Sequence, residues 1–247
     1  MKIGTHRHMT GFSLLELSVV LAVLGALTLG LGSQWESLQA ARQHNAALAE
    51  LSSARAALYA YVLRNRRLPC PAAESDHGFA PDPCPAERNR GLLPHASLGL
   101  DPPSSAPLYY AVHRGAGVDL VKPASTRHNR VEMAQRAGIE TALTTLARRT
   151  TADVSQPHHP ATPAAVHNDD CSPARAVNPA FLLLAPVQAV SSSAAASRGF
   201  DGQNQPFVGG TSLCSAAPER PRHAHYDDLV LSEPAAALLG WILQRAR

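Results

Sequence analysis

Histidine and aspartate side chains are the residues of this chain that could bind a metal ion or move a proton. They gather at three places: His158-His159, His167 ahead of Asp169-Asp170, and His223 with His225 ahead of Asp227-Asp228. Imidazole is a ligand for zinc, and carboxylate oxygens are ligands for calcium. No helical ligand spacing and no calcium-loop spacing is present, and most of the histidines lie in proline-rich stretches. We therefore interpret them as solvated loop histidines and assign no metal and no cofactor, while calcium binding by Asp227-Asp228 remains open.

Catalytic motifs are missing from the sequence. The Ser191-Ser192-Ser193 run has neither a GxSxG context nor a nearby base, so it does not predict a nucleophile. No P-loop and no GxGxxG loop occurs. The net charge is +3, and no Lys/Arg run is interleaved with aromatic residues, which gives no support for a nucleic-acid partner. The sequence predicts a protein that is not an enzyme.

The chain has four cysteines, Cys70, Cys84, Cys171 and Cys214, and none of them belongs to a CxxC pair. An even number at wide spacing suits two disulfides in an oxidising compartment. Proximity in the sequence favours the pairs Cys70–Cys84 and Cys171–Cys214. Other pairings, or unrelated buried thiols in a cytosolic protein, remain open.

A long apolar stretch follows a basic start that contains Lys2 and Arg7 and no acid. It runs from Phe12 to Leu31 with Glu16 as its one charge, and as a helix it would be about 30 Å long. This pattern predicts a transmembrane segment at 12–32. The basic residues ahead of it place the N-terminus in the cytoplasm and the rest of the chain outside the inner membrane.

Glu16 argues against a secretory signal peptide, the first alternative. A carboxylate at membrane depth costs about 2.5–3.5 kcal/mol on insertion scales, and a disposable signal has no reason to carry that cost. The apolar stretch is also too long for such a signal. A plain signal anchor with an acid present by chance is the second alternative.

The segment Gly11-Phe12-Ser13-Leu14-Leu15-Glu16-Leu17 resembles the cleavage and methylation motif of type IV prepilins at every position. In that family a prepilin peptidase cuts after the glycine and methylates the new amino group. The resemblance implies a cytoplasmic leader at 1–11, cleavage between Gly11 and Phe12, and N-methylation of Phe12.

Charge pairing gives Glu16 a reason to lie in an apolar helix. Cleavage would leave a free amine on Phe12, and Glu16 of one subunit could pair with the Phe12 amine of its neighbour. Two charges that are each costly in an apolar environment become tolerable together, and their pairing fixes the register of assembly.

The resemblance implies a structural, minor subunit of a type IV pilus or of a type II secretion filament, either a pilin or a pseudopilin. The expected partners are prepilin peptidase, other pilin or pseudopilin subunits, an inner-membrane assembly platform and membrane lipid. The expected location is the bacterial inner membrane, single-pass with the head in the periplasm, and then the filament. The alternative is a membrane-tethered periplasmic binding protein that does not polymerise. An anchored hydrolase lacks any supporting residue.

One helix is expected from Phe12 to about Arg66, since no proline occurs before Pro69 and good helix formers dominate. Its second half, 33–67, is predicted to be amphipathic, with Leu48, Leu51, Leu58 and Val62 at helical spacing. Two helices with a break at Gly30-Leu31-Gly32 remain the alternative.

The remaining residues, 68–247, are expected to form an α+β head: a small antiparallel sheet with long loops, packed against the N-terminal helix. Strands are predicted at 107–112, 180–186 and 225–231, and helices at 140–149 and 234–247. Proline-rich or polar loops are predicted at 150–175 and 201–211. The order of these segments also resembles pseudopilin-like proteins with large heads.

Overall fold

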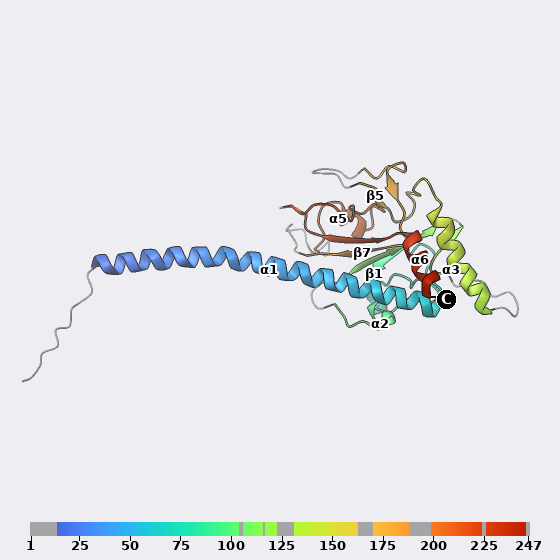
Figure 1. Ribbon diagram of the computed structural model, residues 1–247, viewed down its shortest axis with the longest axis horizontal. Helices are drawn as coiled ribbons and strands as arrows, with labels where there is room; N and C mark the ends of the chain where they lie inside the picture. Colours follow the sequence, from blue (N-terminus) through green and yellow to red (C-terminus); the bar gives the residue numbers. More distant parts are fainter. Residues whose placement is uncertain are drawn as a thin grey trace, which may run out of the picture. The chain divides into compact units, whose positions relative to one another are not determined.

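The structure is a computed structural model that describes residues 14–103, 106–115, 117–122, 131–162, 170–187, 199–223 and 226–245 (Figure 1). The chain divides into two compact units, 1–42 and 43–247, which are described in turn. Gly11 and Phe12, the residues of the predicted cleavage site, lie outside the described residues.

Helix α1 runs without a break from Leu14 to Asn65. The glycines at 30 and 32 do not end it. It ends where Arg66 takes a left-handed φ of 53° and donates its backbone N–H to the Val62 carbonyl at 2.8 Å. Pro69 cannot continue the helix, because its nitrogen has no proton to donate.

The first part of α1 carries large apolar side chains that are exposed to solvent. They are Leu14, Leu15, Leu17, Val19, Val20, Leu21, Val23 and Leu24, each at least 47% exposed. A helix with leucine and valine on every side is normally buried by other apolar surfaces. Within the residues that the structure describes, these side chains are not buried in this way.

No helix within the described part of the chain is long and apolar enough to cross a membrane. The expected transmembrane segment at 12–32, and with it the single-pass inner-membrane localisation, is corrected by this finding.

The second unit is built on a four-stranded antiparallel sheet of β1 (Arg90–Leu92), β2 (Tyr109–Val112), β7 (Phe181–Ala185) and β8 (Leu229–Glu233). The strand order is β1-β2-β7-β8. This confirms the predicted α+β class with an antiparallel sheet. The first two predicted strands contain β2 and β7, whereas β8 begins only at Leu229, after the first residues of the predicted last strand.

One face of the sheet is covered by helices, and we call it the helix-covered face. The residues that pack there come from α1, α3 (Val131–Ala147) and α6 (Ala235–Arg245), together with alternate residues of β2 and β7. The α1 contribution is one stripe at helical spacing: Ala47, Leu51, Ala54, Leu58 and Val62. Leu48, predicted to belong to this stripe, is 45% exposed, because Ala47 takes the inward position.

The opposite face is covered by irregular segments, and we call it the loop-covered face. Tyr109, Ala111, Leu182 and Leu184 of the sheet meet the aromatic rings of Phe200, Phe207 and Tyr226 there. Phe207 lies on the short helix α5 (Asn204–Val208), within a segment predicted to be loop. Because both faces are covered, β2 and β7 are buried at every residue.

Small elements complete the second unit. Two-residue ladders pair β3 (Arg114–Gly115) with β4 (Val118–Asp119) and β5 (His159–Pro160) with β6 (Ala176–Val177). The η1 turn spans Glu74–Asp76, and α2 spans His95–Leu98. The prediction of continuous loop at 150–175 is therefore wrong at β5, where backbone pairing draws a proline-rich segment into the fold.

Candidate functional site

Three aspartates meet on the loop-covered face, at the entrance to β8. Carboxylate oxygens of Asp201, Asp227 and Asp228 lie within 4.8 Å of one another. Asp201 is 2% exposed and Asp228 is 4% exposed, whereas Asp227 is half-buried. Exposed acidic clusters are common without any ligand, but carboxylates withdrawn from water together repel one another strongly. The cluster is therefore a candidate cation site.

Two short segments bring these aspartates together. Asp227 and Asp228 directly precede β8, whose ladder to β7 begins at Leu229. Asp201 lies in a turn where Gly202 adopts a left-handed φ of +50°, a conformation in which a side chain would cause strain. The Asp201 backbone N–H donates to Asp228 Oδ2 at 2.9 Å, which fixes the turn against the start of the strand.

Asn204 holds the other side of the Asp228 carboxylate. Its Nδ2 donates to Asp228 Oδ2 at 3.0 Å, and its Oδ1 accepts the Ala216 N–H at 2.9 Å. The second oxygen, Asp228 Oδ1, is buried and accepts no hydrogen bond. A buried carboxylate oxygen without a donor is costly, so this atom marks the position where a cation would be most stabilising.

The pKa of Asp228 also favours a bound cation. The pKa of Asp228 is raised to about 8, mainly by burial and to a smaller extent by the negative charges of Asp201 and Asp227, while the two donated hydrogen bonds oppose the shift. At neutral pH this carboxyl therefore keeps a proton unless a positive charge replaces that proton. A divalent cation can do so, and its binding would release the proton.

The donor set fits a hard cation. Carboxylate oxygens suit Ca²⁺ and Mg²⁺, and Ca²⁺ accepts irregular sets of six to eight oxygens from side chains, backbone and water. Asp201, Asp227 and Asp228 would supply the charged part of such a set. The sequence did not predict this site, because Asp201 lies far from the other two in the chain. The sequence does contain a pattern that could have indicated the site: an Asp-Gly turn at Asp201-Gly202 and a second pair of acids at Asp227-Asp228.

The prediction of solvated histidines is wrong for His158 and His159, which are 4% and 7% exposed. His159 lies in β5, and its Nε2 lies 2.8 Å from Ser232 Oγ of β8. His223 is exposed, as predicted. His167 and His225 lie outside the described residues. Backbone pairing buries the first two histidines, and local composition could not show it.

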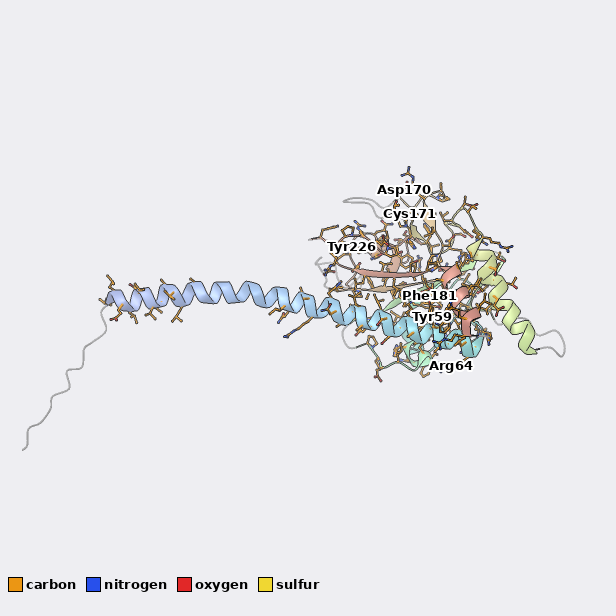
Figure 2. All side chains as sticks on the ribbon, in the orientation of Figure 1. Tyr59, Arg64, Asp170, Cys171, Phe181 and Tyr226 are labelled. Carbon is orange, nitrogen blue, oxygen red and sulfur yellow. A yellow bond between two sulfur atoms is a disulfide. The ribbon has the colours of Figure 1, made fainter. Side chains whose placement is uncertain are left out.

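Both predicted disulfides are confirmed: Cys70–Cys84 and Cys171–Cys214. The second lies close to the aspartate cluster on the loop-covered side, where Figure 2 labels Cys171 and Tyr226. Gln203 Nε2 donates to Cys171 Sγ at 3.6 Å and to the Cys214 carbonyl at 3.4 Å. Since Gln203 is the neighbour of Asn204, two adjacent side chains connect this disulfide to Asp228.

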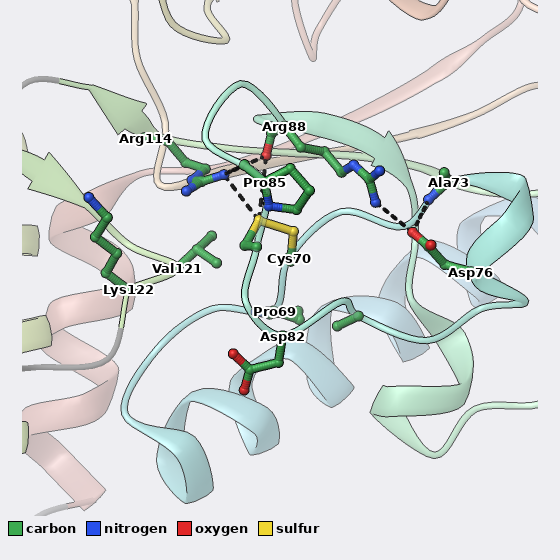
Figure 3. Close-up of a disulfide and its surroundings, with 12 residues drawn as sticks. Pro69, Cys70, Ala73, Asp76, Asp82, Pro85, Arg88, Arg114, Val121 and Lys122 are labelled. Carbon is green, nitrogen blue, oxygen red and sulfur yellow. Dashed lines mark hydrogen bonds and ion pairs between the residues drawn. A yellow bond between two sulfur atoms is a disulfide. The ribbon is translucent and has the colours of Figure 1, made fainter.

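The first disulfide lies under Arg114, as Figure 3 shows. The Arg114 guanidinium donates to Cys84 Sγ at 3.0 Å and to the carbonyls of Pro85 and Arg88, while Asp119 pairs with its other side at 3.1 Å. Arg88 in turn pairs with Asp76. These contacts close the loop between α1 and β1 and give it a structural role.

Of the predicted assembly residues, only Glu16 is described. It lies in the first turn of α1 and is exposed among the apolar side chains that flank it. Its predicted partner, the Phe12 amine, lies outside the described residues. The pairing stays a prediction.

A groove of about 580 Å³ lies beside α1 in the head. Its floor is apolar and comes largely from leucines and prolines: Leu92, Leu93, Leu100, Leu108, Pro102, Pro103 and Pro107. Glu50, Glu74 and Asp101 line it together with two histidines, and no Lys or Arg is among its lining residues. Its size is in the range of ligand sites, and its charge favours a ligand with an apolar body and a cationic group.

Comparison with protein-family models, with curated proteins and with solved structures finds no match to this chain.

Proposed function

We propose that this chain is a subunit of a filament of the type IV pilin class, cut between Gly11 and Phe12 and assembled through α1. The observation that carries the proposal is the unequal burial of one helix. Its stripe from Ala47 to Val62 is packed in the head, while the apolar side chains from Leu14 to Leu24 are exposed. Copies of the same helix would bury those side chains against one another.

The motif at Gly11 to Leu17 supports the same proposal from the sequence. Prepilin peptidase is the proposed processing partner, and other subunits of the same class are the proposed assembly partners. The head would then be a structural module. Two disulfides, together with a cation bound on the loop-covered face, would stabilise the head. Its surface loops would determine which neighbouring subunits it contacts.

Mass spectrometry of the mature N-terminus tests the processing step. The chain is co-expressed with a prepilin peptidase, and the expected product begins with N-methylated Phe12. A Gly11→Leu variant is the control and should keep its leader. A mature chain that begins beyond Leu31 would contradict the proposal.

The role of Glu16 is tested by its incorporation into filaments. If Glu16 pairs with a neighbour's amine, Glu16→Ala leaves that amine without its counter-charge, at a cost of roughly 3–5 kcal/mol where the site is enclosed. Cleavage should survive while incorporation falls at least tenfold. Ser18→Ala, two residues away on the same exposed stretch, is the matched control. Equal amounts of both variants in sheared filament fractions would show that Glu16 does not set the register.

The groove favours a second candidate function, a binding protein that does not polymerise. Its apolar floor and the carboxylates of Glu50, Glu74 and Asp101 suit a small apolar amine or a cationic apolar peptide. Such a protein would remain monomeric after cleavage, and binding of the amine would raise the melting temperature of the protein. Ala49→Trp, which fills the groove from α1, should abolish this rise, and a chain that polymerises and binds no amine would exclude the second function.

A further inference from the structure

A second group of ligand-type side chains surrounds one of the disulfides. A ring nitrogen of His158 and the sulfurs of Cys171 and Cys214 lie within 4.8 Å of one another. Within the described ranges, the other disulfide, Cys70–Cys84, belongs to no such group. The same chain therefore contains one disulfide with an adjacent imidazole and one without.

The backbone holds this geometry without help from the disulfide. His158 donates its N–H to the Leu213 carbonyl at 3.0 Å, and its own carbonyl accepts the Ser215 N–H at 3.0 Å. These two bonds flank Cys214 on both sides and form an isolated parallel bridge between His158 and Cys214. If the disulfide opens, the imidazole and the Cys214 sulfur stay side by side.

A backbone acceptor fixes the tautomer of the His158 ring. His158 Nδ1 lies 2.8 Å from the Gln156 carbonyl, which can only accept, so Nδ1 carries the proton of the neutral ring and Nε2 carries the lone pair. Histidines that bind metals commonly donate their second nitrogen to a backbone carbonyl in this way. Gln203 Nε2, 3.6 Å from Cys171 Sγ, adds a donor that stabilises a thiolate.

We infer that the reduced head binds a soft, thiolate-preferring cation through His158, Cys171 and Cys214. Zn²⁺ fits such a site, because one imidazole and two thiolates leave its fourth position for water. The inference is independent of filament assembly. Metal capture and disulfide closure would compete for the same two sulfurs, so a bound metal would hold the head in its reduced form.

The chemistry requires a reductant, and a phosphine is suitable. The phosphine takes the oxygen of one water and becomes a phosphine oxide, the S–S bond breaks, and the two sulfurs each take a proton. Zn²⁺ then displaces these two protons as the thiolates bind. When the metal leaves, a small-molecule disulfide re-forms the S–S bond: it accepts the two electrons and two protons and is itself reduced to two thiols.

Thiol protection in the full-length protein tests the inference without any substitution. The protein is reduced with the phosphine, mixed with one equivalent of Zn²⁺, alkylated and mapped by mass spectrometry. We expect Cys171 and Cys214 to be protected while Cys70 and Cys84 are alkylated at the rate found without metal. Equal alkylation of all four cysteines, or protection of Cys70 and Cys84, would overturn the inference.

Competition with a coloured zinc chelator gives the ligands. The reduced protein should bind one tight equivalent of Zn²⁺, the oxidised protein none, and Cys171→Ser should abolish binding. His158→Gln should weaken it at least tenfold, and the Cys70→Ser/Cys84→Ser variant should bind as the wild type does. The melting curve of each oxidised variant shows whether it is folded. Unchanged affinity in folded His158→Gln, or equal binding by the oxidised protein, would mean adventitious binding only.

Discussion

The two faces of the sheet are covered by different means. On the helix-covered face, α1, α3 and α6 bring apolar stripes against β2 and β7, and an ion pair of Arg55 with the buried Glu233, 2.7 Å long, joins α1 to β8. On the loop-covered face, irregular segments bring Asp201, Asn204 and Asp228 into the interior beside aromatic rings. A disulfide and a set of side-chain hydrogen bonds hold these segments in place.

The difference shows what regular structure supplies. A helix satisfies its own backbone and needs only an apolar stripe to be buried. A loop must find a partner for each buried polar group, so its order depends on specific side chains and cross-links. The stability of the helix-covered face should therefore depend on the volume of its side chains. The stability of the loop-covered face should depend on cations, redox state and pH.

The largest expected effect concerns Asp228 and the cation. The folded pKa of about 8 lies above the unfolded value of 3.8, so this residue's contribution to stability is lost as pH rises from 3.8 to 8. Without a cation the cost reaches about 5 kcal/mol at pH 8. We expect Ca²⁺ to raise the free energy of unfolding at pH 8, as measured by urea titration.

Asp228→Asn separates the cost of ionising the buried carboxyl from the stabilisation by Ca²⁺. The variant should be more stable than the wild type at pH 8 in chelator and should no longer respond to Ca²⁺. Asp101→Asn, which changes an exposed carboxylate elsewhere, should respond as the wild type does. An unchanged calcium response in Asp228→Asn would exclude the aspartate cluster as the site.

The second effect comes from the disulfides. The Cys171–Cys214 bridge closes a longer loop than Cys70–Cys84, 43 residues against 14, so chain entropy predicts losses of about 4 and about 3 kcal/mol for the paired serine variants. Only loss of Cys171–Cys214 should also weaken the calcium response, because Gln203 and Asn204 connect that bridge to Asp228. Calcium-dependent melting of the two variants measures this difference, and an equal response would refute the connection.

The third effect belongs to the helix-covered face. Leu58 is fully buried in the α1 stripe, and Leu58→Ala should cost about 3 kcal/mol, within the range for buried leucines. Leu48→Ala, at a position 45% exposed on the same helix, should cost less than about 0.5 kcal/mol. Neither variant should change the calcium response. Urea unfolding with and without Ca²⁺ tests both statements, and a similar cost for the two leucines would contradict the assigned stripe.

The smallest effect is the acid sensitivity of His113, which is buried at the end of β2 and makes no hydrogen bond through its ring. The pKa of His113 is lowered to about 4, mainly by burial and to a smaller extent by the charge of Arg149, whereas Asp153 and Asp119 oppose the shift. The folded pKa lies below the unfolded value of 6.5, so stability is lost as pH falls below 6.5. At pH 5 the loss is about 2 kcal/mol. In His113→Phe, the urea unfolding midpoint should change less between pH 7 and pH 5 than it does in the wild type. An unchanged pH dependence would show that other groups cause the acid sensitivity.

The sequence by itself determined the elements whose causes are local. Absence of proline and a 3.6-residue apolar stripe specify α1, and unbroken apolar runs specify β2 and β7, because such runs are typical of strands buried on both faces. Proximity along the chain was sufficient to predict both disulfides.

Only the tertiary structure decided which distant residues meet. The pairing of β7 with β8 carries Asp228 to Asp201, and the bridge between His158 and Cys214 buries a histidine that its proline-rich surroundings suggested was solvated. Local composition reports the average solvation of a segment. Burial of one side chain depends on backbone hydrogen bonds to residues far away in the chain, and these bonds follow from the topology of the sheet.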